Sequence, residues 1–283
     1  MPFEFIPDTT RFNLTNALCL AEASALAYEP SSVIKAMTIK QWGMKRCDCF
    51  DQNDTQVFIA GNDDIILLSF RGTASNEDWM TDSKTRLIPY KKGRVHRGFN
   101  EAFSLTKDWV KRTITEYDDR IQSLWVTGHS LGAALATLAV DYLIDKENLF
   151  TVNGLYTFGS PRVGDRKFAE NFDDGIKHRT FRFVYDEDVV TRVPPRILGY
   201  EHVGTVRYID RKGVLQYNNV TWKRWLDRTE SVTIRSLDRY RELKHQYPGG
   251  LHDHGMYSYI RYIKKNLEKD NPGPMDFKTY INQ

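Results

Sequence analysis

The stretch VTGHSLGAALA, Val126–Ala136, places a serine between two glycines and then continues as a helix-forming sequence. It is preceded by a β-rich run, SLWVT (Ser123–Thr127), and followed by AALATLAVDYLI (Ala133–Ile144), which is strongly helical. A strand, a G-x-S-x-G turn and a helix in direct succession leave the serine on a sharp, strained turn, where neighbouring side chains would collide with the adjacent elements. The two glycines remove those side chains. We therefore predict that Ser130 lies on a strand-to-helix turn.

Such a turn gives Ser130 a chemical setting. The helix N-terminus carries partial positive charge, and the Leu131 backbone N–H would be one donor to a developing oxyanion. Both would favour negative charge that develops on an oxygen nearby, so Ser130 is a candidate nucleophile. The alternative is a structural serine in a glycine-rich turn, and a nucleophile needs an acid and a base elsewhere in the chain.

Helical and strand-like segments alternate along the rest of the chain, and no Pro/Gly-rich linker divides it. This alternation predicts an α/β fold with a mostly parallel central sheet covered by helices, in one domain over residues 1–283. The expected helices are Leu14–Tyr28 with Asn13 as its cap, a short helix after Ser31, and His96–Tyr117. Two strands are expected within Gln56–Phe70, with a turn at residues 61–63 between them. Further strands are expected at Leu155–Phe158 and Phe181–Tyr185.

Composition excludes several classes of protein. The net charge of +3 is too small to indicate nucleic-acid binding. The mean hydropathy is -0.53 and no apolar run approaches the ~18 residues of a membrane span. The N-terminal residues lack the basic start and apolar stretch of a Sec-type signal peptide, so we expect a cytoplasmic protein or export by a signal-less route. Cys19, Cys47 and Cys49 form a poor disulfide framework and no metal-ligand pattern, so we expect reduced thiols and no metal.

The partners of a nucleophilic serine on such an elbow follow it in the order Asp or Glu, then His. The segment FRFVYDEDVVTRVPP ends a strand with three acidic residues, and GLHDHGMYSYI starts the last expected helix with two histidines. Spacing alone does not choose among the candidates. These are Asp186, Glu187 and Asp188 for the acid, and His178, His202, His245, His252 and His254 for the base.

Taken together, six segments resemble the fungal-type (class 3) triacylglycerol lipase family of α/β-hydrolases. They are IILLSFRGTASNEDWMTD, VHRGFNEAF, VTGHSLGAALATLA, LYTFGSPRVGD, FRFVYDEDVVTRVPP and HDHGMYSYI, in this order over roughly residues 56–260.

Matched position by position, the resemblance implies a triad of Ser130, Asp188 and His254. It implies an oxyanion hole made by Thr73 and the Leu131 N–H, with Asp82 holding the Thr73 hydroxyl. Residues at other motif positions would support the site without doing chemistry: His129, Tyr156, Arg162, His96 and His202.

The resemblance thus implies a carboxylic-ester hydrolase, most simply a lipase that cleaves acylglycerol esters through an acyl-enzyme, with no cofactor. The expected partners are an ester lipid and, transiently, a lipid surface. A phospholipase or a short-chain carboxylesterase would use the same triad. A non-catalytic lipid-binding module on the same fold would have lost triad residues, whereas all three are present.

The chain departs from the family in three places. Tyr185 stands where the family has an asparagine before the acid. The lid segment Ala74–Asp82 is polar, with only Trp79 and Met80 large and apolar, so we do not expect strong interfacial activation. A basic insertion at about residues 211–250 carries nine Lys or Arg against four Asp or Glu. With Trp222 and Trp225 it would suit an anionic membrane surface, although a solvated helix with inward tryptophans is the favoured interpretation.

Overall fold

A computed structural model describes residues 3–72, 86–118, 121–145, 150–186, 188–217 and 254–270. Two predicted site residues, Thr73 and Asp82, lie outside these ranges, as do the lid segment and most of the basic insertion.

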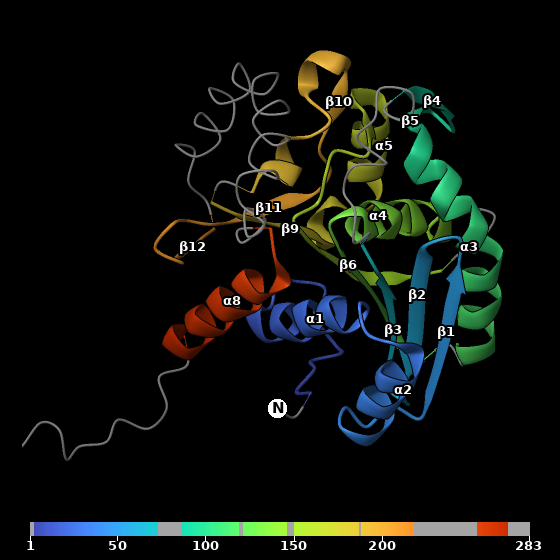
Figure 1. Cartoon of the computed structure of the whole chain (residues 1–283), viewed down its shortest axis with the longest axis vertical. Helices are drawn as coiled ribbons and strands as arrows, with labels where there is room; N and C mark the ends of the chain where they lie inside the picture. Colours follow the sequence, from blue (N-terminus) through green and yellow to red (C-terminus); the bar gives the residue numbers. More distant parts are fainter. Residues whose placement is uncertain are drawn as a thin grey trace, which may run out of the picture.

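A twisted eight-stranded sheet forms the centre of the molecule, in the order β1-β2-β3-β6-β7-β9-β11-β12 (Figure 1). The five strands from β3 to β11 in this order run parallel, whereas β1, β2 and β12 are antiparallel to their neighbours. The strands are β1 (Arg46–Gln52), β2 (Thr55–Gly61), β3 (Ile65–Phe70), β6 (Ser123–His129), β7 (Val152–Phe158), β9 (Thr180–Tyr185), β11 (Thr205–Ile209) and β12 (Leu215–Gln216).

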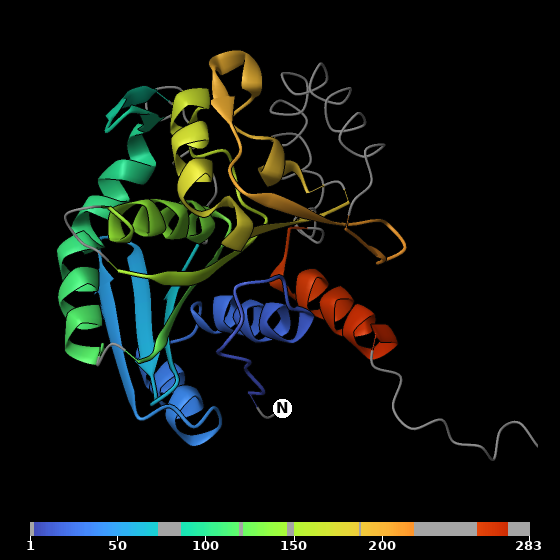
Figure 2. The same cartoon turned by 180° about the vertical axis from the view of Figure 1, so that it is seen from behind.

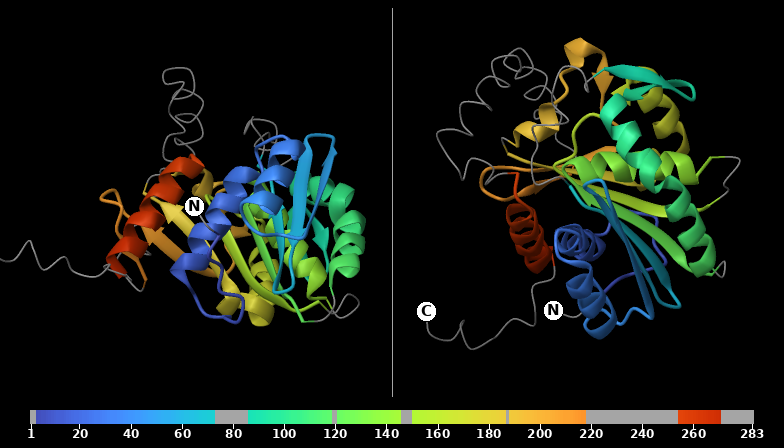
Figure 3. Two further views of the ribbon diagram at one scale, coloured as in Figure 1. Left: turned by 90° about the horizontal axis from the view of Figure 1, so that it is seen from below. Right: turned by 45° about the vertical axis from the view of Figure 1, so that its right-hand side comes forward.

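Helices cover both faces of this sheet (Figures 2 and 3). One face carries α3 (Arg97–Tyr117), α4 (Leu131–Leu143) and α5 (Arg166–Ile176), and the other carries α1 (Leu14–Leu26), α2 (Ser31–Lys40) and α8 (Met256–Asp270). A small antiparallel sheet adds β10 (Tyr200–Glu201), β8 (Gly164–Asp165), β5 (Gly93–His96) and β4 (Leu87–Tyr90). Three 3-10 turns complete the described elements: η1 (Lys177–Arg179), η2 (Val189–Arg192) and η3 (Arg196–Leu198).

Side-chain alternation along the strands builds two large cores, one on each face of the sheet. In β2, Val57 and Ile59 join the cluster under α3 and α4, whereas Phe58 and Ala60 join the cluster under α1 and α8. Strand β3, IILLSF, is buried along its whole length. A strand between two helical layers has no solvent face, so it needs apolar residues on both sides.

The mostly parallel sheet between helical layers is the fold class that the alternation predicted. The structure adds β1, which the sequence did not indicate, and ends α1 two residues before the predicted Tyr28. After Leu26 the helix tightens into a turn, because the Tyr28 N–H donates to Ala25 O and the Glu29 N–H to Leu26 O, each three residues back. None of the described helices is both long and apolar enough to cross a membrane.

Candidate active site

Ser130 occupies the sharp turn between β6 and α4 that the sequence predicted. Its backbone has φ 57° and ψ -128°, a left-handed φ that side chains rarely adopt. Both flanking glycines are required sterically: a Cβ on Gly128 would collide with the Gly132 carbonyl, and one on Gly132 would collide with the Phe70 carbonyl of β3. The serine is 1% exposed. As the first residue of α4, Leu131 has no carbonyl four residues back in the helix to accept its N–H.

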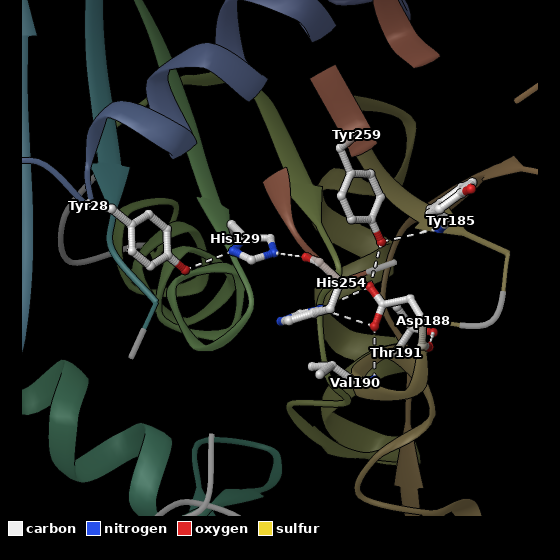
Figure 4. Close-up of polar contacts among 8 residues, drawn as sticks. All are labelled: Tyr28, His129, Tyr185, Asp188, Val190, Thr191, His254 and Tyr259. Carbon is white, nitrogen blue, oxygen red and sulfur yellow. Dashed lines mark hydrogen bonds and ion pairs between the residues drawn. The ribbon is translucent and has the colours of Figure 1, made fainter. Parts of the chain in front are cut away.

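His254 and Asp188 form a buried pair (Figure 4), and the His254 ring lies 4.5 Å from the ring of His129, the residue before Ser130. The Nδ1 atom of His254 lies 3.0 Å from each carboxylate oxygen of Asp188. The other ring nitrogen, Nε2, is buried and finds no hydrogen-bond partner among the residues that the structure describes. A carboxylate that holds Nδ1 leaves Nε2 to take a proton, as a general base must, but Ser130 Oγ makes no hydrogen bond to Nε2 in this structure.

Three donors fix the Asp188 carboxylate. Besides His254, the Tyr259 hydroxyl donates to Oδ2 at 2.6 Å and the Val190 N–H donates to Oδ1 at 3.0 Å. Burial raises the pKa of Asp188, but the adjacent His254 and these hydrogen bonds outweigh it and hold the pKa below its usual range. Burial and the nearby Asp188 charge raise the pKa of Tyr259 well above its usual value, so its hydroxyl keeps its proton and stays a donor.

His129, immediately before the serine, ties the site to the N-terminal helix. Its Nε2 lies 2.6 Å from the His254 carbonyl oxygen and its Nδ1 lies 2.8 Å from the Tyr28 hydroxyl. Burial, reinforced by His254, lowers the pKa of His129 to about 3. A neutral ring with both bonds made must donate from Nε2 and accept at Nδ1, so Tyr28 is the donor. His129 thereby holds the backbone of His254 next to Ser130.

Gly159 is a further position near the site where only a glycine fits. Gly159, at φ +59° after β7, lies so close that a Cβ there would come within 2.8 Å of Asp188 Oδ2 and 2.9 Å of His254. The backbone N–H of Ser130 donates to Phe158 O on the same strand. The end of β7 therefore packs between the serine turn and the acid–histidine pair.

The structure brings His129, Asp188 and His254 into contact, and Ser130 and Leu131 directly follow His129 in the chain. Other candidates point elsewhere: Asp186 bonds the exposed Arg211, and His178 lies on η1 with Arg179. Glu187, His245 and His252 lie outside the described residues.

The other residues that were expected to support the site form hydrogen bonds with backbone groups. Arg162 donates to the Arg192 and Pro194 carbonyls, His202 contacts the Thr191 carbonyl, and His96 caps α3. The Tyr156 hydroxyl accepts from the Asn13 N–H at 3.1 Å.

Sequence reasoning gave no role to Tyr28, Tyr259 or Gly159. Tyr259 falls in the segment HDHGMYSYI, whose Tyr position was the available signal. Nothing in the sequence connects Tyr28 to a residue 101 positions away.

A strained serine at the carboxyl edge of a mostly parallel sheet, followed in the chain by a buried Asp–His pair, defines an α/β-hydrolase. Residues 67–198 match the family described as Lipase (class 3). Over these residues the chain is similar to the class 3 lipase family of the α/β-hydrolase superfamily.

Similarity to individual proteins agrees with this. The chain is 34% identical over 166 residues to a lipase of Rhizomucor miehei, covering 55% of this chain and 45% of that protein. It is 31% identical over 177 residues to phospholipase A1-II 1 of Oryza sativa, covering 54% of this chain and 44% of that protein. The solved structure of lipase II from Rhizopus niveus superposes with a TM-score of 0.60 at 29% identity, over 69% of this chain and 80% of that one. The chain spans about half the length of the curated relatives it matches.

Proposed function

We propose that this chain is a carboxylic-ester hydrolase, a lipase acting on acylglycerol esters, with Ser130, His254 and Asp188 as its triad. The observation that carries the proposal is the combination of Ser130 on its strained turn with a His254 whose Nδ1 is held by Asp188 and whose buried Nε2 is open. The names of the lipase relatives support the substrate class.

The geometry supports a two-step mechanism. His254 Nε2 takes the Ser130 proton while Oγ attacks the ester carbonyl, and Asp188 fixes the imidazole tautomer and stabilises its positive charge. The Leu131 N–H, with Thr73 as the proposed second donor held by Asp82, stabilises the oxyanion of the tetrahedral intermediate. The imidazolium then returns the proton to the departing alkoxide as the acyl C–O bond breaks. Water hydrolyses the acyl-enzyme by the same proton transfers in a second cycle, and this chemistry needs no cofactor.

Replacing the nucleophile tests the assignment. We expect Ser130→Ala to keep the fold and to lower kcat/KM for a soluble short-chain ester by at least about 10⁴-fold. Circular dichroism and thermal melting check the fold, and a variant that retains a near-normal rate would overturn the triad. His254→Ala should lose comparable activity.

A phospholipase remains the second candidate, because the similarity to a phospholipase A1 matches that to the lipases in extent. Hydrolysis rates on short soluble esters, emulsified trioleoylglycerol and phosphatidylcholine vesicles separate the two. A lipase should favour the emulsion, and a strong preference for the vesicles would favour the phospholipase.

A further inference from the structure

The turn η3 lies at the upper edge of the molecule beside β10 (Figure 1), and it carries two large exposed apolar side chains. Ile197 is 78% exposed and Leu198 is 54% exposed. We call this pair the apolar tip. Single exposed apolar residues are ordinary on protein surfaces, so what distinguishes the tip is how it is held and where it lies.

Hydrogen bonds fix the turn that presents the tip. The Leu198 N–H donates to Pro195 O, and Gly199, at φ +85°, donates to Arg196 O at 2.7 Å. The loop before it is held from two sides, because Arg162 donates to two of its carbonyls and His202 contacts a third. The two apolar side chains therefore lie on a turn whose backbone is held by hydrogen bonds.

The same loop carries the proposed catalytic acid. Asp188 caps η2, and the chain runs from there through residues 193–195 to the tip nine residues later. Asp188 follows β9, and Ser130 follows β6, which lies parallel to β9 in the same sheet. Because parallel strands end at the same edge, the tip emerges from the edge that bears the proposed site.

Charges around the tip are balanced. Arg196 pairs with Glu201 at 2.5 Å, and on neighbouring α5 Arg166 pairs with Glu170 at 2.7 Å. The groove between η3 and α5 is also lined by Asp173, Asp174 and Lys177, and Lys177 pairs with Asp173 at 2.6 Å. Among the residues that the structure describes, this part of the surface offers no excess of positive charge to an anionic membrane, and it suits an uncharged surface.

The tip is small compared with a protein–protein interface. A stable protein–protein interface takes roughly 20–30 residues a side, whereas the tip offers two. A lipid surface imposes no such minimum, because each apolar side chain that enters it contributes independently.

We propose that Ile197 and Leu198 insert into the surface of neutral acylglycerol and hold the chain there. The inference rests on the proposed function, since it names the surface on which that function would be exercised. Insertion from the loop that carries Asp188 would place the site's edge of the sheet toward the lipid.

Binding without turnover tests the tip directly. In a Ser130→Ala background, Ile197→Ser/Leu198→Ser should lower partitioning onto trioleoylglycerol emulsion droplets at least about tenfold, measured by flotation. The matched control is Val33→Ser/Met37→Ser, which removes two exposed apolar side chains from α2 at the lower edge of Figure 1. The control should partition as the parent does. Equal partitioning of the tip variant and its parent, or a loss confined to the α2 variant, would overturn the proposal.

Activity gives an independent readout. With Ser130 intact, the tip variant should hydrolyse a soluble short-chain ester at the parental rate and emulsified trioleoylglycerol at least about tenfold more slowly at limiting droplet concentration. If the tip variant kept the parental rate on both substrates, the proposal that the tip inserts into the lipid surface would be wrong. Failure of the parent to hydrolyse any ester would contradict the proposed function instead, and flotation would still decide whether the tip binds.

Discussion

Tyr259 and Val190 set the position of one buried carboxylate, that of Asp188. A carboxylate that is 1% exposed must have its oxygens satisfied by donors, because an unsatisfied buried charge is costly. The histidine supplies only part of this, since its single Nδ1 proton is shared between both oxygens. The Tyr259 hydroxyl, at 2.6 Å, is the shortest of the contacts to Asp188. We infer that Tyr259 is a positioning residue for the proposed acid.

Removing that hydroxyl should therefore affect turnover more than binding. We expect Tyr259→Phe to lower kcat roughly tenfold with little change in KM, and to lower the free energy of unfolding by about 1–3 kcal/mol, because Asp188 loses a charge-assisted hydrogen bond. Steady-state kinetics and urea unfolding measure the two effects. Tyr257→Phe is the control, because Tyr257 lies on the same helix but is 70% exposed. Equal kinetics for the two variants would show that Tyr259 only fills space.

At the scale of elements, the crossing of β6, α4 and β3 creates the strained turn. Helix α4 approaches β3 so closely that only a hydrogen fits at position 132, where any Cβ would overlap the Phe70 carbonyl. The alanines at 133 and 134 continue the close contact and are fully buried. The left-handed backbone of Ser130 is thus maintained by packing of whole elements, which offsets the local strain.

Gly132→Ala should force α4 away from β3. We expect a loss of about 2–3 kcal/mol in the free energy of unfolding and a much lower hydrolytic rate, because overpacking moves the serine. Gly175→Ala in α5 is the contrasting substitution: its Cβ would meet only the far end of Ile144, at 3.3 Å. That change should be neutral or stabilising by up to about 1 kcal/mol, as expected for alanine in a helix. Thermal and urea unfolding distinguish them, and similar losses in both would refute the packing argument.

At the scale of the molecule, the two ends of the described chain meet under one face of the sheet. Helices α1 and α8 share the core that contains Phe58, Trp125 and Tyr259 (Figure 3). The hydrogen bond between the Tyr28 hydroxyl, just after α1, and His129 connects this packed core to the site. Because His129 is buried and neutral in the folded protein, the stability of the whole fold depends on its protonation.

The sign of this dependence follows from the lowered pKa. Between about pH 6.5, the ordinary histidine value, and about 3, the unfolded chain binds a proton at His129 that the folded chain does not. Stability is therefore full above about pH 6.5 and falls as the pH drops. Between pH 7.5 and 5.0 the wild type should lose roughly 2 kcal/mol more free energy of unfolding than His129→Gln. His202, whose pKa is also lowered by burial and by nearby arginines, contributes to both proteins and cancels in the comparison. Urea unfolding at the two pH values measures this difference, and an equal fall in both proteins would contradict it.

The sequence alone predicts the fold class, the serine turn and the resemblance to class 3 lipases. These rest on local signals: the alternation of strands and helices, glycines where backbones must approach, and motifs that are each contiguous in the chain. Ser130, with its two glycines and the strand and helix around it, could be read from a few consecutive residues.

Which side chains contact one another is visible only in the folded structure. Val126–Ala136 does not encode that Tyr28 reaches His129, that Tyr259 reaches Asp188, or that Gly159 lies against both Asp188 and His254. These contacts join elements far apart in the chain, and their distances follow from how the sheet orders its strands and how the helices pack on it. A pattern of residue types carries no such distances, because packing fixes them only when the whole core forms.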